Sequence, residues 1–283
     1  MDMIQNFDTL GLFFSRNLGI LNEKYYENFY FLKMHESLSE QQFKALDFFN
    51  ISNGNHLIIC LCTEAGICIS ASGFTPAMLD QLYERILRVR YANIQFIGNK
   101  DLLLALFNRF EISFEIYKDR IIYKTDAVLK LKKKHIGKGV NSNMDDYEEL
   151  VGLSYTYSQE EWGDRKGREI DYFEAMVMGW IQRQCLVQYN VTGGIGCIAQ
   201  VLNLENGLPI VGSLFTPEKF RGKGYATMLV HAITKKLLNS GFPEVGIISD
   251  ATNPYTNKMF VDIGYKPIQT HIEMSCKDFF RTN

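Results

Sequence analysis

Hydrophobic and polar residues alternate with two different periods along this chain, and each period predicts one kind of element. The helical spacing i, i+3, i+4, i+7 is clearest in the second half, at Ala226, Leu229, Val230, Ile233 and Leu237. It predicts a helix over 226–239, which Gly241 and Pro243 would end. A continuous apolar run then predicts a buried strand over 245–249.

The same patterns predict the other elements of the second half. Helices are expected at 145–157, 168–183 and 253–263, and strands at 185–191, 195–202, 208–216 and 268–274. Glycine and asparagine separate the strands, as turns require.

In the first half, a hairpin is predicted around Glu64-Ala65-Gly66, with strands at 56–63 and 67–72. Thr75-Pro76 is typical of a helix start and predicts a helix over 75–90, and Ser37-Leu38-Ser39-Glu40 resembles a capping box that would open a helix through Phe49. Further elements are a helix at 100–109 and strands at 94–97, 112–117 and 121–129. Both halves thus show the order strand pair, helix, strand, helix, strand, which predicts an α/β fold (α+β mixed sheet).

The 283 residues leave room for about two domains. The predicted division is an N-terminal domain over 1–130 without a cofactor site, a basic and then Gly/Ser/Asn-rich linker over 131–144, and a C-terminal domain over 145–283. We interpret the run Lys132-Lys133-Lys134 as a solvated charge run. A formal net charge of -2 gives no electrostatic reason to expect a nucleic acid as partner.

The chain begins with acidic rather than basic residues and has no apolar run near the length of a membrane span, so we expect a cytoplasmic protein with no membrane partner. No two of its six cysteines form a Cys-x-x-Cys pair, and its five histidines are scattered. Buried reduced thiols and no metal site are the expectation.

The segment Phe220-Arg221-Gly222-Lys223-Gly224-Tyr225-Ala226 lies between a predicted strand and a predicted helix, where glycines and the helix dipole favour an anion. A nucleoside triphosphate loop is excluded because its Gly-x-x-x-x-Gly-Lys-Ser/Thr is absent. A dinucleotide fold would use Asp250 for a ribose, but Pro217-Glu218-Lys219 interrupts the tight turn and Thr227 occupies the third glycine position.

A third loop pattern, Arg/Gln-x-x-Gly-x-Gly/Ala, is satisfied at each fixed position by residues 221–226. Downstream, the segment from Asn253 to Tyr265 resembles the pattern Asn-x-x-x-x-x-x-Tyr-x-x-x-Gly-Phe/Tyr, except that Phe260 stands in the first tyrosine position. On these two motifs, the C-terminal half resembles the GNAT superfamily of acyl-CoA-dependent N-acetyltransferases. The resemblance covers about residues 145–275.

The resemblance implies a GNAT-like fold with splayed central strands and acetyl-CoA as co-substrate. The pyrophosphate would lie on backbone N–H groups of Arg221, Gly222, Lys223, Gly224, Tyr225, Ala226 and Thr227. Pantetheine would run between the strands that end near Thr216 and Asp250, where the amides of Leu214, Phe215 and Thr216 could bond it and polarise the thioester carbonyl. Asn253 would contact the cofactor arm.

The resemblance also implies a general acid and a general base. The family often uses a tyrosine as general acid, and Phe260 replaces it here, so Tyr255, Tyr265 or water would have to supply the proton. Asp250 and Glu218 are the candidate bases, each with the alternative of being a solvated loop acid or a helix cap.

The first half is open to two interpretations: a degenerate copy of the GNAT fold, or an unrelated α+β substrate domain. We expect an N-acetyltransferase that transfers acetyl directly to a primary amine, as a monomer or homodimer. The alternatives are an acyl-CoA-binding or sensing module that lacks the acid, and a dinucleotide binder. The pattern of residues does not reveal the amine.

Overall fold

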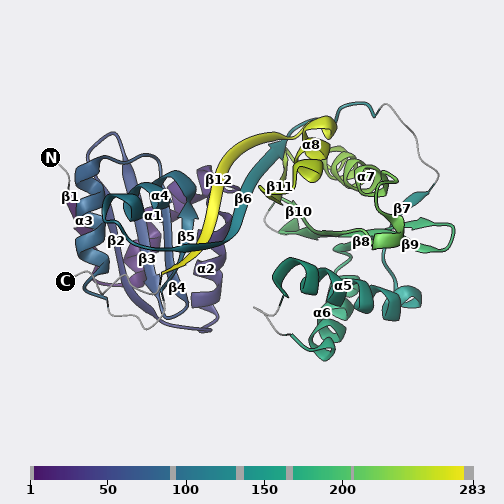
Figure 1. Cartoon of the computed structure of the whole chain (residues 1–283), viewed down its shortest axis with the longest axis horizontal. Coiled ribbons are helices and arrows are strands. Elements are labelled where there is room, and N and C mark those ends of the chain that lie inside the picture. The colour runs from purple at the N-terminus through teal and green to yellow at the C-terminus, as the bar shows by residue number, and fades with distance from the viewer. Residues whose placement is uncertain (1–2, 90–93, 132–136, 164–167, 205–206, 277–283) are drawn as a thin grey trace. The chain divides into compact units, whose positions relative to one another are not determined.

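The computed structural model describes residues 3–89, 94–131, 137–163, 168–204 and 207–276 (Figure 1). It divides into two compact units. The first consists of Met1–Ile122, Asp250–Thr252 and Ile268–Asn283, and the second of Tyr123–Ser249 and Asn253–Pro267. Most of the last described strand, from Ile268 onward, therefore groups with the first unit, whereas the expected C-terminal domain over 145–283 contains all of it.

The sheet of the first unit is mixed. Its strands follow the order β1 (Met3–Asn6), β2 (Ala45–Ser52), β3 (Leu57–Thr63), β4 (Gly66–Ala71), β5 (Ile94–Asn99) and β12 (Lys266–Cys276). The β4–β5 pair is parallel and the other neighbours are antiparallel. Residues His271–Cys276 of β12 pair with the whole of β5.

Helices cover both faces of this sheet: α1 (Leu10–Glu23), α2 (Phe29–Ser39), α3 (Pro76–Ile86) and α4 (Lys100–Arg109). The buried apolar residues of α3 and α4 form one core with inward side chains of β2 such as Phe49 and Ile51. The alternate side chains of β2 face α1, where Asn17 and Asn50 exchange hydrogen bonds of 3.1 and 2.9 Å. This alternation is what a strand with both faces covered requires.

Several predictions for the first half are confirmed. The hairpin forms as β3 and β4, and α4 has the predicted bounds. The hydroxyl of Thr75 accepts a hydrogen bond from the Met78 N–H at 3.3 Å and so caps α3. The helix ends at Ile86, earlier than the predicted end at Arg90, which itself lies outside the described residues.

Two predictions are wrong. The expected helix over 37–49 does not form, because α2 ends at Ser39, whose hydroxyl bonds back to the His35 carbonyl at 3.0 Å instead of opening a new helix. Gln41 then has a positive φ of 59°, and the following residues are strand β2. The two strands expected at 112–117 and 121–129 are one continuous strand, β6 (Glu115–Thr125).

The second unit is built around strands in the order β11 (Val245–Asp250), β10 (Ile210–Phe215), β9 (Gly194–Leu202), β8 (Leu186–Val191) and β7 (Lys138–Asn141). Figure 1 shows α5 (Tyr147–Trp162) and α6 (Ile170–Gln182) on one face of this sheet, and α7 (Tyr225–Asn239) and α8 (Pro254–Ile263) on the other. Only the β10–β11 pair is parallel among these neighbours.

The elements predicted for the second half are confirmed, with ends that shift by a few residues. The stretch expected as a linker is partly structured, because β7 pairs with β8 and a short helix, Met144–Asp146, follows it. The lysine run 132–134 lies outside the described residues.

No helix in the described ranges is long and apolar enough to cross a membrane. Within the same ranges, no cluster of His, Cys, Asp and Glu side chains could hold a metal ion. All six cysteines are buried as free thiols.

Candidate active site

The central strands of the second unit diverge. In the parallel pair, β10 and β11 match only at Ile210 with Gly246 and Val211 with Ile247, although β10 continues to Phe215. On its other side, β10 shifts register against β9 between Gly212 and Phe215, and Ser213 within this bulge has a φ of 47°. A bulge bends the strand that carries it. The second half of β10 therefore leaves β11 and opens a wedge between the two strands.

The first unit has no such wedge in its corresponding parallel pair. Strands β4 and β5 match at three positions, from Ile67 with Phe96 to Ile69 with Gly98. Beyond them, the Ala71 N–H donates to the Asn99 side-chain oxygen at 2.8 Å and closes the end of the pair. No bulge interrupts β4 against β3. The two units thus differ in whether this pair of strands is open.

A glycine loop connects β10 to α7. It starts with a 3-10 turn, Glu218–Phe220, in which the Phe220 N–H bonds the Pro217 carbonyl at 2.8 Å. Gly222 and Gly224 follow with φ of 73° and 79°, values that favour glycine. Gly224 is the N-cap of α7, and its carbonyl accepts the first helical bond from Met228.

The helix start presents backbone donors. The N–H groups of Tyr225, Ala226 and Thr227 have no partner within α7, because the first turn of a helix has none. A Cβ added to Gly222 would meet no atom within 4 Å, so the loop backbone borders open space. Such groups, together with the helix dipole, are suited to bind an anion. The Arg221 N–H is already used, since it donates to the Glu218 carbonyl at 3.1 Å.

Arg221 ties the loop to two other elements. Its Nε donates to the Thr216 carbonyl at 2.9 Å, and its Nη2 lies 2.7 Å from both carboxylate oxygens of Glu160 in α5. The guanidinium carbon lies 5.8 Å from the centre of the Phe215 ring. Sequence reasoning did not single out Glu160, because no pattern in the sequence connects residues so far apart.

Aromatic side chains pack against the glycine loop and the start of α7. Phe220 is buried and meets the Tyr225 ring edge-on at 6.1 Å, and Tyr225 stacks on Tyr189 at 5.8 Å. Gly196 on β9 makes room for this stack, since a Cβ there would lie 3.0 Å from the Tyr225 ring. The Lys223 ammonium donates to the Lys219 carbonyl at 3.0 Å. These aromatic contacts and the Lys223 hydrogen bond therefore stabilise the conformation of the loop.

The chain is similar to a known family in sequence over part of its length and to known structures in fold over most of it. The family model described as FR47-like protein matches residues 196–273. No curated protein matches the chain in sequence. Among solved structures, a GCN5-related N-acetyltransferase from Sphaerobacter thermophilus superposes with a TM-score of 0.57 at 12% identity, over 85% of this chain and 84% of that one.

Two further structures match over nearly the whole chain. A GNAT-family acetyltransferase from Colwellia psychrerythraea has a TM-score of 0.56 at 13% identity, and covers 97% of this chain and 98% of its own. A Drosophila protein also has a TM-score of 0.56 at 13% identity, with coverages of 98% and 99%. This chain has the GNAT fold. The fold and the splayed strands implied by the sequence motifs are thereby confirmed.

In this GNAT fold, the position of the usual acid is buried in aromatic packing. Phe260 on α8 is 4% exposed, with ring centres of Tyr123 at 5.9 Å and Tyr265 at 6.2 Å. The Tyr265 hydroxyl lies 2.7 Å from the Thr234 hydroxyl, and burial raises the pKa of this phenol well above its usual range. Tyr255 is 87% exposed. Tyr265 is therefore a buried core residue.

The candidate carboxylates differ in their surroundings. Asp250 ends β11, and its Oδ1 accepts from both the N–H and the hydroxyl of Thr252, at 2.8 and 2.7 Å. Glu218 is exposed in the 3-10 turn of the loop. Asn253 caps α8, where its side-chain oxygen accepts from the Thr256 N–H at 3.1 Å. Its amide group remains available as a donor in this arrangement.

Proposed function

We propose that this protein is an N-acetyltransferase that transfers the acetyl group of acetyl-CoA directly to a primary amine of a small molecule or peptide. The observation that carries the proposal is the open wedge between β10 and β11, followed at once by the glycine loop and the start of α7. A thioester arm requires an extended slot with backbone donors, and its diphosphate requires an anion site.

The residues present fit coenzyme A. Backbone N–H groups from Gly222 to Thr227 would hold the diphosphate, and the open space beside Gly222 admits it. The backbone at Leu214 and Phe215, on the unpaired side of β10, and at Thr216 directly after it would bond the pantetheine arm and polarise the thioester carbonyl. Acetyl-CoA supplies an activated acetyl group, and the chain supplies its position next to the amine.

Proton transfer is assigned to a carboxylate and to water. Asp250 or Glu218 would take the proton of the ammonium, directly or through water. The departing thiolate would take its proton from water, because Phe260 has no proton to donate and the Tyr265 hydroxyl is held by Thr234.

A second candidate function is an acyl-CoA-binding or sensing module. The observation that favours it is again Phe260, since a buried phenyl ring stands where GNAT enzymes often carry a tyrosine. Both functions share the cofactor site and differ in whether an amine is acetylated.

Calorimetry of the full chain with acetyl-CoA, with NAD as control, tests the site. A ligand present at 100 times its dissociation constant stabilises a protein by about 2.7 kcal/mol, so a thermal-shift assay gives an independent readout. Thiol release across a panel of amines then separates the functions. Release with any amine establishes the transferase, binding without release leaves the sensor, and no binding of acyl-CoA contradicts both.

A further inference from the structure

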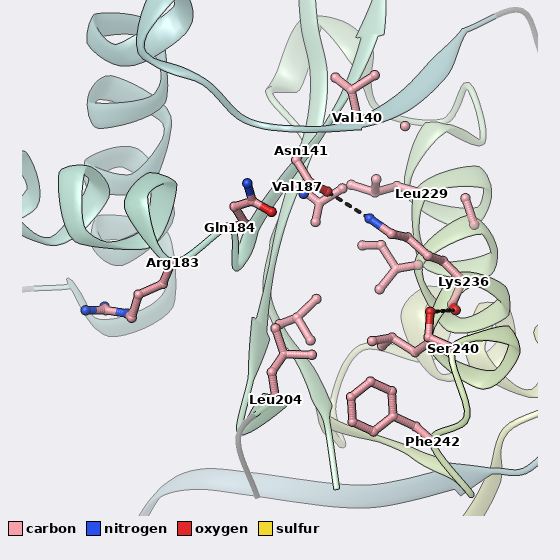
Figure 2. A pocket seen from close by; sticks show the side chains of 15 residues that line it. Val140, Asn141, Arg183, Gln184, Val187, Leu204, Leu229, Lys236, Ser240 and Phe242 are labelled. Atoms are coloured by element: carbon pink, nitrogen blue, oxygen red, sulfur yellow. Dashed lines mark hydrogen bonds between the residues drawn. The ribbon is translucent and has the colours of Figure 1, made fainter. Parts of the chain in front are cut away.

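A cavity of about 540 Å³ lies in the second unit, between α7 and the edge of the sheet formed by β7 and β8 (Figure 2). Its wall on the helix side runs from Leu229 to Ser240, and its wall on the sheet side includes Val140 and Val187. None of its lining residues belongs to the glycine loop, to β10 or to β11. It is therefore a different place from the candidate acetyl-CoA site.

Small residues keep this cavity open. Gly139 on β7 faces α7, and a Cβ added to it would lie 3.5 Å from Leu229 Cδ1 and 3.8 Å from the Ala232 Cβ, at ordinary contact distance. Larger side chains at Gly139 or Ala232 would fill the space. Protein interiors are close-packed, and ligand pockets are clefts of about 300–1,000 Å³. The cavity thus has the size of a small-molecule site.

The lining is mostly apolar, and its polar side chains are those of Asn141, Arg183, Gln184, Lys236 and Ser240. Leu229, Ile233 and Leu237 of α7 are buried, and Figure 2 shows the Phe242 ring beside the same space. The Lys236 ammonium reaches towards β7 and donates to the Asn141 side-chain oxygen at 3.2 Å.

The charged side chains that line the cavity, among the described residues, are cationic. Within this part of the chain no carboxylate lines it, and Lys236 forms no ion pair with an acid. Arg183 also lies at its border, but Figure 2 shows its guanidinium directed away from the space. Lys236 is therefore the cation that a ligand in the cavity would meet.

We propose that this cavity binds a small amphipathic monocarboxylate, with its apolar chain against Leu229, Ile233 and Leu237 and its carboxylate on the Lys236 ammonium. A flexible ammonium with an amide beside it suits one carboxylate, and the apolar walls suit a hydrocarbon chain. The site goes beyond the proposed transferase function, because it shares no residue with the glycine loop or the wedge.

The probe is decanoate, used below its micelle concentration, with decanol as its uncharged match. Calorimetry on the full chain is expected to show saturable binding of one decanoate, and at least tenfold weaker binding of decanol. Acetyl-CoA should not displace the decanoate. Displacement would place the probe in the wedge and overturn the proposal, as would equal binding of decanol or no saturable binding.

Variants locate the site. Lys236→Met should weaken decanoate at least tenfold, whereas Lys235→Met removes the same charge from the neighbouring position, which does not line the cavity, and should change binding less than twofold. Ala232→Phe should abolish binding by filling the space. Gly139→Leu fills the cavity from β7 and replaces Ala232→Phe in the test if that variant does not fold. Equal effects of the two lysine variants, or binding that survives in a folded, filled variant, contradict the proposal.

Discussion

The Asn99 side-chain oxygen accepts a hydrogen bond from the Ala71 N–H at 2.8 Å, and this contact closes the parallel strand pair of the first unit. In the second unit, the equivalent strands diverge after Val211 and Ile247. The Asn99 side chain thus occupies the position in the first unit that corresponds to the open wedge between β10 and β11 in the second unit. Both units share the order of strands and helices, so the difference between them lies at this position and in the loop that follows.

Asn99→Ala should destabilise the protein by about 1–3 kcal/mol, because it leaves the partly buried Ala71 N–H without its acceptor. Asn99→Asp keeps an acceptor oxygen and places a negative charge at the start of α4, which the helix dipole favours. Asn99→Asp should therefore lose less free energy of unfolding than Asn99→Ala. Urea unfolding of both variants measures the difference, and an equal loss would show that the hydrogen bond contributes little.

Gly222→Val should weaken acetyl-CoA at least tenfold, since a side chain at this positive-φ position would occupy the open space beside the loop. Gly241→Val is the matched control. Gly241 also has a positive φ and no atom within 4 Å of an added Cβ, but it follows the other end of α7. Calorimetry compares the two, and similar losses would mean that backbone strain, rather than blocked access, causes the effect.

Glu160→Gln should tighten acetyl-CoA binding by a few-fold, because it removes a negative charge 2.7 Å from Arg221 beside the proposed diphosphate site. The pair is about half exposed, so the free energy of unfolding should change by no more than about 1 kcal/mol. Glu148→Gln makes the same change at an exposed position near the start of α5 and is the control. Weaker binding in Glu160→Gln would instead show that the ion pair positions the loop.

Phe260→Tyr places a hydroxyl inside the cluster of Tyr123 and Tyr265, so we expect a loss of about 1–3 kcal/mol in the free energy of unfolding. We also expect thiol release to rise by less than about tenfold, below the roughly hundredfold gain that a positioned acid supplies. Rates across pH 6–9 and a urea curve measure both. A large gain with a new pH dependence would assign the missing acid to this position.

His271 should make the protein sensitive to acid. Burial lowers the pKa of this imidazole to about 3, its Nδ1 has no hydrogen-bond partner among the described residues, and its ring stacks on Tyr30 at 5.2 Å. Between the unfolded pKa of about 6.5 and this value, the unfolded chain binds a proton that the folded chain excludes. Stability present above pH 6.5 is therefore lost as the pH falls, by up to about 1.4 kcal/mol per pH unit.

His271→Phe keeps the ring and removes the proton site. Between pH 6.5 and 4, its free energy of unfolding should depend less on pH than that of the parent protein. Near pH 8, the free energies of unfolding of both proteins should be insensitive to this group. Urea midpoints at four pH values test this. Identical pH dependence in the two proteins would assign the acid sensitivity to other groups.

Local patterns in the sequence predicted the elements that carry the candidate cofactor site. The apolar stripe of α7, the glycines before it and the Asn253 cap all lie within a few residues of the structure they determine. Helix α1 was not predicted, although Thr9 caps it through a hydrogen bond from the Leu12 N–H. A buried Asn17 interrupts its apolar stripe and is satisfied by Asn50, a partner that only the folded sheet provides.

Other features depend on contacts between distant residues. Ser39 lies in a sequence that resembles a helix start, but it ends α2, because the next apolar residues are taken into the sheet as β2. The bulge at Ser213 and the bond between Arg221 and Glu160 follow from the pairing of β10 with β9 and from the position of α5. Hydrophobic periodicity describes one element at a time and contains no information on such pairs.

The pairing of β12 with β5 has a consequence for synthesis on the ribosome. Strand Ile94–Asn99 pairs with β4 on one side, but its other side has no neighbour until His271–Cys276 have been translated and have left the exit tunnel. Until then this strand has an unpaired row of amides and carbonyls, the kind of edge that invites association with other chains. The N-terminal unit thus completes its fold only after the C-terminal unit has been made.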